Sequence, residues 1–325
     1  MNRSNWLAIG IRVTIISLFL LSICPDSLPA QVPAINWPAP TGKLRVIIDA
    51  DAANEVDDQW AIALALGFPA RFQIEGFVAA HYGDRGGKNG IQKSYNNILE
   101  VLEFAGMKNK FPVKKGSDPI TYKDQINESE GVDFIIATAK SATPGNPLWV
   151  ITLGAVTDAA MAILKDPSIS DRVIVLWHGR TDWSNRCWNF NASNDLKAVQ
   201  VLFDKSDRFI LFDTGTYLNM PMPESEKRIA TNGKLGAYLH NIRKKSAYAQ
   251  LPDKGFFDVG DIAALLRDSI SRSETIPTPA VADDYKYVFD NANNRRLFTR
   301  IYEINREATF NLLDEALKRL SKQQP

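Results

Sequence analysis

The feature that most limits how this chain can fold is a repeated alternation between short apolar runs and helical segments. Five apolar runs have the length of strands, at 44–49, 72–80, 147–153, 172–177 and 208–212. Segments with helical periodicity lie between them, at 57–66, 91–104, 157–164 and 196–203. Continuous apolar runs are typical of parallel strands that are buried on both faces, with helices as the crossovers. The pattern predicts an α/β fold with a mostly parallel, Rossmann-like central sheet flanked by helices.

The same pattern predicts a single domain. No internal repeat or low-complexity linker interrupts the chain, so we expect one domain over 31–325 with a core at about 41–321. The C-terminal segment 295–321 is predicted to be a long amphipathic helix packed on the outside. Apolar residues make up 45% of the chain, which is enough to bury a core of this size.

The first 30 residues have the pattern of a secretory signal peptide. Arg3 and Arg12 precede an apolar stretch at 13–24, and Ala30 provides a small residue for cleavage. The stretch has 12 residues, whereas a membrane-spanning helix needs about 20, which favours cleavage over an uncleaved anchor. A lipoprotein is less favoured because the residue before Cys24 is bulky. We therefore expect an exported protein, periplasmic or secreted, with no stable membrane span after processing.

Charge and cysteine content exclude several kinds of partner and site. The chain has 38 basic and 37 acidic residues, and loss of residues 1–30 would leave 36 of each. A chain without a basic excess binds the phosphate backbone poorly, so we expect no nucleic acid partner. Cys24 and Cys187 are too few for a cysteine-built zinc site or a disulfide framework. Cys187 is expected to be buried and structural.

The segment that follows the first predicted strand carries five carboxylates in ten residues. They are Asp49, Asp51, Glu55, Asp57 and Asp58. A solvated turn that caps the next helix would be the simpler explanation, but a cap needs only one or two acids. Carboxylates this close repel one another unless a cation or hydrogen-bond donors neutralise them. Because oxygen ligands without His or Cys select a hard cation, the cluster predicts a calcium or magnesium site.

Polar groups also follow the other predicted strands, at the edge where open α/β sheets bind ligands. These groups belong to His81, Asp84, Leu153 (a carbonyl turned by Gly154), Asn189, Asn191, Asp258 and Asp261. Short amide and carboxylate side chains suit hydrogen bonding to sugar hydroxyls. Each group alone is ordinary for a turn, but their recurrence at successive strand ends predicts one shared site.

Together these segments resemble the nucleoside hydrolase family of the inosine-uridine preferring type. The most specific match is 49–58, because the family's first strand ends in Asp-x-Asp followed by Asp-Asp and an Ala-Leu helix, and this chain has the longer form of that motif. LGAVTDAAMAIL (153–164) resembles the family's Leu-Gly-Pro-Leu-Thr-Asn-Leu-Ala segment. FPVKKGSDPI (111–120) and NFNASNDLKAVQVLF (189–203) are similar to two further segments. The similarity covers most of residues 43–266 in order.

The resemblance implies calcium-dependent hydrolysis of an N-glycosidic bond, by default that of ribonucleosides to ribose and free base. One calcium ion per chain would be held by Asp51, Asp58, the Leu153 carbonyl and Asp261. Asp51 would also be the catalytic residue that orients and deprotonates a metal-bound water. The substrate-binding residues would be Asp57, Asp84, Asn189, Asn191 and Asp261. Relatives are commonly dimers or tetramers, which leaves the homo-oligomeric state of this chain open.

The chain departs from the family pattern at three positions. Asn189 replaces a Glu and Asp84 replaces a common Asn, so sugar recognition is expected to differ. Gly260 stands where many members have a His that can protonate the leaving base, an assistance worth about 10²–10⁴-fold in rate. The candidates to replace that His are His81, His178 and stacking by Tyr82, Trp183, Trp188 or Phe256. For each of them, a packing role is the simpler explanation.

Two other functions stay open. Asp49-x-Asp51 after a buried strand is also typical of haloacid dehalogenase-like phosphatases, and Lys254 could be their lysine. However, residues 79–81 lack the hydroxyl group of that family, and Asp57-Asp58 would have no role in it. An exported sugar- or nucleoside-binding protein without turnover would fit the absence of the family's His at position 260.

Overall fold

The structure is a computed structural model that describes residues 37, 39, 41–246, 250–289 and 296–323. Residues 32–325 form one compact unit. The predicted signal peptide, residues 1–30, lies outside the described residues. Within the described ranges, none of the helices combines the length and the apolar character needed to cross a bilayer.

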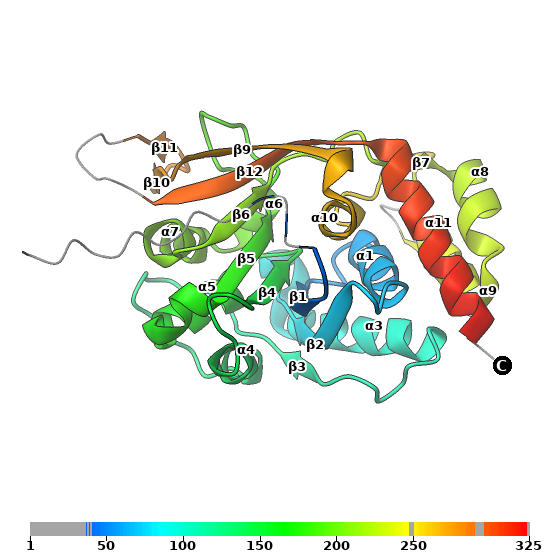
Figure 1. Ribbon diagram of the computed structural model, residues 1–325, viewed down its shortest axis with the longest axis horizontal. Helices are drawn as coiled ribbons and strands as arrows, with labels where there is room; N and C mark the ends of the chain where they lie inside the picture. Colours follow the sequence, from blue (N-terminus) through cyan, green and yellow to red (C-terminus); the bar gives the residue numbers. More distant parts are fainter. Residues whose placement is uncertain (1–36, 38, 40, 247–249, 290–295, 324–325) are drawn as a thin grey trace, which may run out of the picture. The chain divides into compact units, whose positions relative to one another are not determined.

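An eight-stranded sheet with the order β3-β2-β1-β4-β5-β6-β12-β9 forms the centre of this unit (Figure 1). Its strands are β1 (Leu44–Ala50), β2 (Phe72–Ala79), β3 (Val113–Lys115), β4 (Leu148–Thr152), β5 (Val173–His178), β6 (Phe209–Phe212), β9 (Ser271–Pro277) and β12 (Leu297–Ile304). All neighbours are parallel except β12 and β9. The first six strands have the order 3-2-1-4-5-6 of dinucleotide-binding sheets, in which ligands bind where the order reverses, between β1 and β4. The predicted Rossmann-like sheet is confirmed.

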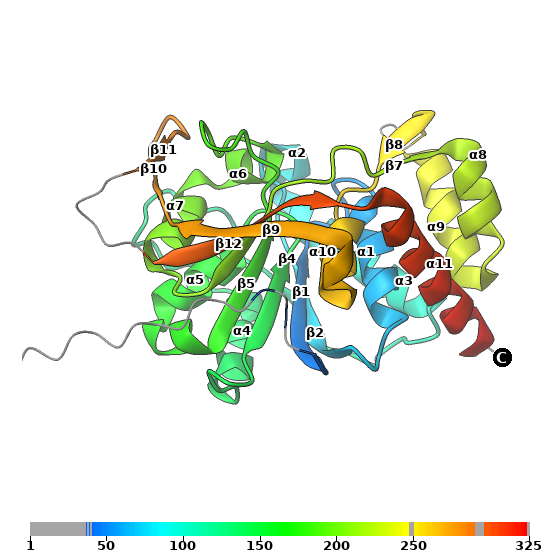
Figure 2. The same ribbon diagram turned by 45° about the horizontal axis from the view of Figure 1, so that its top comes forward.

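Helices cover both faces of the sheet (Figures 1 and 2). They are α1 (Asp57–Leu66), α2 (Gly83–Gly86), α3 (Gly90–Phe104), α4 (Glu130–Lys140), α5 (Thr157–Lys165), α6 (Phe190–Asn194), α7 (Leu196–Lys205), α8 (Met222–Ser225), α9 (Gly233–Lys245), α10 (Val259–Leu266) and α11 (Arg306–Gln323). On β1, Val46 and Ile48 join the buried cluster under α1, α3 and α10, and Ile47 joins the one under α4, α5 and α7. A strand covered on both faces must be apolar at nearly every position, which explains the continuous apolar runs.

The helix α1, which begins with the last two acids of the cluster, is buried on every side. It packs against α10 and α11 (Figure 1). A helix that is surrounded by other elements is apolar all round rather than on one face. It ends at Gly67, where a Cβ atom would lie only 2.4 Å from the Cβ of Ala316 on α11. Glycine at this position therefore lets the end of α1 approach α11 closely.

The C-terminal segment corrects one prediction. A single helix is predicted over 295–321, but the structure has β12 (Leu297–Ile304) followed by α11, and Arg295 lies outside the described residues. Phe298, Ile301 and Ile304 are buried, a spacing that also fits one face of a helix. Pairing with β6 on one side and β9 on the other favours the strand, because β-branched and aromatic residues pack well in a sheet.

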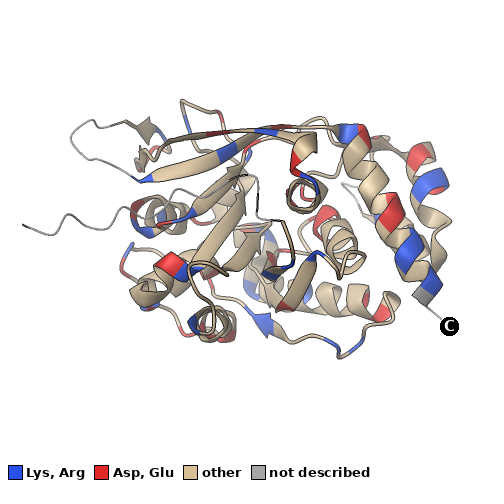
Figure 3. Ribbon diagram, viewed as in Figure 1, with Lys and Arg blue, Asp and Glu red and all other residues tan. Residues whose placement is uncertain are grey.

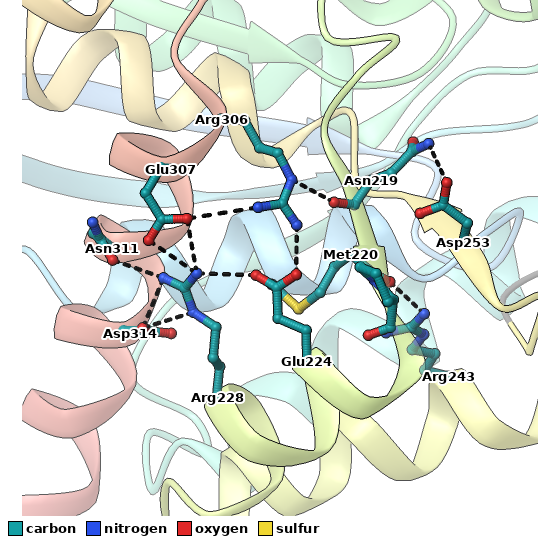
Figure 4. Close-up of polar contacts among 11 residues, drawn as sticks. Asn219, Met220, Glu224, Arg228, Arg243, Asp253, Arg306, Glu307, Asn311 and Asp314 are labelled. Carbon is teal, nitrogen blue, oxygen red and sulfur yellow. Dashed lines mark hydrogen bonds and ion pairs between the residues drawn. The ribbon is translucent and has the colours of Figure 1, made fainter.

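A network of ion pairs connects α11 to α8 and to the short helical turn Glu226–Ala230 (Figure 4). Arg228 pairs with Asp314 at 2.9 Å and with Glu224 at 3.0 Å, and Arg306 pairs with Glu224 at 2.6 Å. Figure 3 shows both signs of charge along α11. Single surface pairs contribute about 0–1 kcal/mol, but a shared network that is partly buried orients the helices relative to one another.

Cys187 is a buried free thiol, so its prediction as a buried structural cysteine is confirmed. Burial raises the pKa of the thiol to about 12. The reactive thiolate is therefore scarce at neutral pH. Two short antiparallel pairs complete the fold, β7 (Asn219–Pro221) with β8 (Asp253–Gly255) and β10 (Ala280–Val281) with β11 (Tyr287–Val288).

Candidate active site

A cavity lies at the carboxyl ends of β1, β4 and β5. Its volume is about 480 Å³, counted with its opening to solvent. Nine residues singled out from the sequence line it: Asp51, Glu55, Asp57, Asp58, Leu153, His178, Asn189, Asn191 and Asp258. The fold therefore brings together, at the point where the strand order reverses, groups that are far apart in the chain.

Three of the four predicted metal ligands have an unsatisfied buried oxygen. Oδ2 of Asp51, Oδ1 of Asp58 and Oδ1 of Asp261 accept no hydrogen bond from the described residues. The fourth ligand, the Leu153 carbonyl, accepts one hydrogen bond of 2.8 Å from Nδ2 of Asn191 and keeps a second lone pair. Buried acceptors without donors are unfavourable unless a proton or a cation binds them. Asp51, Asp58 and Asp261 therefore each offer an oxygen that a proton or a cation would satisfy.

Asp258 joins the acidic groups into one cluster. Asp57, Asp58 and Asp258 each place an oxygen within 4.8 Å of the others, and so do the ligand atoms of His178, Asp258 and Asp261. From the sequence, Asp258 is one of the polar groups that follow the predicted strands and has no predicted role. The signal was present, because acids before an apolar helix repeat the layout of the first motif. Either group could hold a metal ion.

Burial and mutual repulsion raise the pKa of these acids. Burial, with the nearby charge of Asp57, raises the pKa of Asp51 to about 7. Burial also raises the pKa of Asp258 well above its usual range, and repulsion by Asp57 and Asp58 adds to the shift. For Asp261, burial raises the pKa to about 6 although the nearby His178 lowers it. In the absence of a cation the cluster therefore keeps protons near neutral pH.

The turn after β4 positions Asp51. A Cβ atom on Gly154 would lie 2.8 Å from Cγ of Asp51, so only glycine leaves that carboxylate in place. The turn itself is held by two hydrogen bonds. Nε1 of Trp177 donates to the Gly154 carbonyl at 3.1 Å, and the amide of Leu153 donates to the Asp49 carbonyl at 2.8 Å.

The two asparagines predicted to bind sugar differ in how much they can offer a ligand. Asn191 donates from Nδ2 to the Leu153 carbonyl and, at 3.0 Å, to the His178 carbonyl, while its Oδ1 accepts no hydrogen bond from a described residue. Asn189 is the N-cap of α6, where its Oδ1 accepts from the amide of Ala192 at 3.0 Å. Its Nδ2 donates to the Cys187 carbonyl at 2.9 Å. Asn189 is thus occupied by its capping role.

Lys254 on β8 neutralises part of the cluster, a role that the sequence did not indicate. Its Nζ lies 2.7 Å from Oε2 of Glu55 and 3.5 Å from Oδ1 of Asp57. Burial lowers the pKa of Lys254, but Asp57 and Glu55 outweigh burial and the pKa is raised. The amide of Phe257 donates to the other oxygen of Asp57 at 3.1 Å. Asp57 is therefore held by a buried cation and a backbone donor.

His81 is buried and lies outside the wall of the cavity. Its Nδ1 accepts from the amide of Gly83 at 3.1 Å. Its Nε2 lies 2.7 Å from Oγ1 of Thr157, which donates to Oδ2 of Asp195 at 2.8 Å. Burial lowers the pKa of His81 to about 4. With both ring nitrogens engaged, His81 is in no position to protonate a leaving base.

Three other predicted residues also lie outside the cavity wall. Asp84 is exposed, because the chain turns away at Gly83, whose φ is 59°, and forms the short helix α2. Trp188 is 57% exposed. Asp261 is fully buried behind His178, whose Nδ1 lies 2.7 Å from Oδ2 of Asp261. The sequence placed these residues near strand ends, but the direction of each turn decides which of them reach the cavity.

The structure also shows how position 260 differs from the family's pattern. A Cβ atom on Gly260 would lie 2.6 Å from Cζ of Phe212 and 2.9 Å from Cδ1 of Leu218. These two core residues occupy the space that a side chain would need. Of the aromatic candidates, Phe256 is fully buried and stacks on Trp60 with ring centroids 3.8 Å apart, a packing role. His178 is the histidine candidate that lines the cavity.

Asp158 supports a prediction about stability. Its Oδ1 accepts from the Ser117 amide at 2.8 Å, but its buried Oδ2 has no hydrogen-bond partner among the described residues. Burial, with repulsion by Asp195, raises its pKa from 3.8 to about 7. An acid whose pKa is higher in the folded state than in the unfolded state lowers the free energy of unfolding as pH rises. For Asp158 this loss of stability occurs between about pH 4 and pH 7.

We therefore expect Asp158→Asn to increase the free energy of unfolding at pH 8, by on the order of 1 kcal/mol or more, and to change it little at pH 4. Asn is also the residue of the resembled family segment at this position. Urea denaturation of both proteins at the two pH values measures the effect, with the exposed Asp124→Asn as the control. An equal effect of Asp158→Asn at both pH values would contradict the prediction.

Comparisons with known proteins identify the family of this chain. The family model described as inosine-uridine preferring nucleoside hydrolase matches residues 46–286. No curated protein sequence is significantly similar to the chain. A purine-preferring ribonucleoside hydrolase from Gardnerella vaginalis has a similar structure, with a TM-score of 0.68 and 21% identity, over 86% of this chain and 100% of that one.

Two further solved structures are similar. An inosine-uridine preferring nucleoside hydrolase from Bacillus anthracis gives a TM-score of 0.64 with 15% identity, over 85% of this chain and 99% of that one. A plant nucleoside hydrolase gives 0.67 with 18% identity, over the same two shares. At such identities the likeness shows the fold, whereas the family model spans the acidic segment and most of the domain. The chain therefore belongs to the inosine-uridine preferring nucleoside hydrolase family and is a hydrolase that acts on N-glycosyl bonds.

Proposed function

We propose that this protein hydrolyses ribonucleosides to ribose and free base with the help of one calcium ion per chain. The observation that carries the proposal is the set of unsatisfied buried oxygens of Asp51, Asp58 and Asp261, of which Asp51 and Asp58 line the cavity. A ligand set made of carboxylates and a carbonyl is the kind that calcium prefers. The proposal assigns those three acids and the Leu153 carbonyl to the ion.

Each residue then has a defined task. Asp51 accepts the proton of the attacking water. Asp57, fixed by Lys254 and the Phe257 amide, and Oδ1 of Asn191 accept hydrogen bonds from the sugar hydroxyls. The carboxylates stabilise the positive charge that develops on the sugar as the bond to the base breaks. A bound calcium ion would supply a Lewis acid that lowers the pKa of the water.

The contact between Gly154 and Asp51 supports a prediction for this mechanism. In Gly154→Ala, the added methyl group must displace the Asp51 carboxylate, so kcat/KM is expected to fall about 100-fold. Steady-state assays of ribose release measure the loss. Gly145→Ala is the matched control, because a Cβ atom there would meet nothing within 4 Å. Wild-type activity of Gly154→Ala would mean that the position of Asp51 does not limit the reaction.

A reducing-sugar assay over a panel of nucleosides tests the function itself. Because Gly260 offers no acid, p-nitrophenyl riboside is assayed beside the panel as an O-glycoside whose leaving group needs no protonation. We expect ribose release from at least one member in the presence of calcium. The alternative is a binding protein without turnover. It would be favoured if nucleosides bind by calorimetry but no member of the panel releases ribose.

Export is a second proposal, which rests on the sequence pattern of residues 1–30. Cleavage after Ala30 would place Gln31 at the N-terminus of the mature protein. N-terminal sequencing of the protein recovered from the periplasm or the medium tests this. An intact N-terminus in a membrane fraction would instead support an uncleaved anchor.

A further inference from the structure

Arg180 is a cation in the wall of the cavity that the mechanism leaves without a task. It follows β5, two residues after His178. Its guanidinium carbon lies 3.9 Å from the centroid of the Phe257 ring, another wall residue. Its side chain forms no hydrogen bond or ion pair with any residue that the structure describes. The five N–H donors of this half-buried group are therefore available to a ligand.

The absence of an ion pair at Arg180 is informative because acids surround it. Asp51, Asp58 and Asp258 line the same cavity. The other two cations nearby are engaged: Lys254 pairs with Glu55, and Arg85 donates to Oδ1 of Asn54 at 3.0 Å while it stacks on Phe190. Arg180 instead stacks on Phe257. The stack also fixes the plane in which the guanidinium presents its donors.

The backbone conformation at Arg180 is consistent with a functional role for its side chain. Its φ is 39°, in the left-handed region that glycine adopts most easily. The amides of Gly179 and Arg180 both donate to the Phe212 carbonyl, at 3.1 and 3.2 Å, which holds the turn. A bulky residue in a sparsely populated conformation beside a cavity is the kind of outlier from which a functional role is inferred.

We propose that Arg180 binds an anionic group of the substrate, so that the enzyme prefers N-ribosides with a carboxylate on the base or a phosphate on the 5′ oxygen. This inference rests on the proposed function and names the substrate class. A planar guanidinium held by a ring presents paired donors that match a carboxylate or a phosphate. The pairing of Lys254 with Glu55 and Asp57, together with a bound divalent cation, offsets part of the negative charge that would repel an anionic substrate.

Three related substrates test the proposal: uridine, orotidine, which adds a carboxylate to the base, and uridine 5′-phosphate. We expect kcat/KM for one of the two anionic substrates to exceed that for uridine by about 10-fold or more, as expected for a hydrogen bond to a charged group. Preference for orotidine places the anion on the base, and preference for the phosphate places it on the sugar. No preference for either would overturn the proposal.

Variants separate recognition from a general effect of charge. In Arg180→Gln, the ratio of kcat/KM for the preferred anionic substrate to that for uridine is expected to fall by about 10- to 100-fold. Arg180→Lys keeps the charge but not the planar donors, so an intermediate ratio is expected. Arg85→Gln is the matched control, since this second stacked arginine does not line the cavity, and it should keep the wild-type ratio. An unchanged ratio in Arg180→Gln would overturn the proposal.

Binding measurements distinguish failure of this proposal from failure of the proposed function. Calorimetry compares orotate with uracil and ribose 5-phosphate with ribose. If no nucleoside is hydrolysed but an anionic probe binds more tightly than its neutral partner, and Arg180→Gln removes the difference, then hydrolysis is wrong and anion recognition stands. If nucleosides are hydrolysed but Arg180→Gln changes neither the affinity for the anionic probes nor kcat/KM for the anionic substrates, the inference fails while the proposed function stands.

Discussion

Asp51→Asn is expected to lower kcat for ribonucleoside hydrolysis by about 10²–10⁴-fold and to leave the fold intact. The side chain is 2% exposed, and asparagine has nearly the same shape as aspartate. An amide cannot accept the proton of the attacking water. The amide also weakens cation binding, because its N–H₂ group either replaces the unsatisfied Oδ2 assigned to the cation or points toward the cation. Both effects act on the same step, so we expect the loss to lie near the upper end of that range.

Measurement of ribose release, together with thermal unfolding, tests this prediction. Unfolding separates a chemical defect from a folding defect, since burial of an uncharged amide here should not unfold the protein. Calcium titration of the variant by calorimetry then shows how much of the loss is due to weaker metal binding. Near-normal kcat in a folded Asp51→Asn protein would mean that another group is the base.

Removal of the metal with a chelator is expected to abolish hydrolysis and to destabilise the fold, and calcium should restore both. The acids of the cluster repel one another in the folded chain, and their pKa values are raised in the absence of a cation. A cation that binds the folded chain but not the unfolded chain stabilises the fold by about 2.7 kcal/mol when it is present at 100 times its Kd. The melting temperature should therefore rise with calcium concentration.

Asp58→Asn makes this test specific to the cluster. Asp58 is 2% exposed and its Oδ1 has no partner among the described residues, so its replacement should remove most of the stabilisation by calcium. Asp118→Asn, which changes an exposed acid, should keep the full effect. Equal stabilisation by magnesium would contradict the assignment of calcium. If neither calcium nor magnesium stabilised the wild-type protein, a metal at this site would be contradicted.

The cavity shows why some residues could be identified from the sequence and others could not. Asp51, Asp57 and Asp58 lie within one short segment, so their density alone indicates a site. Lys254, on the short strand β8, and Arg180, just after β5, are single cations, and nothing around them in the sequence indicates that they approach the acids. Their roles come from contacts between segments far apart in the chain, such as the 2.7 Å pair between Lys254 and Glu55.

The sequence alone determined the α/β class, the parallel sheet and the acidic cluster at its edge, because burial on both faces and like-charge repulsion leave local patterns. The tertiary structure alone decided that residues 297–304 form a strand, since an apolar spacing that fits a helix also fits a strand with partners on both sides. It likewise decided that Asp258 joins the cluster and that Asp84 and His81 stay outside the cavity. The physical reason is that the direction of a turn depends on long-range packing, which no local pattern records.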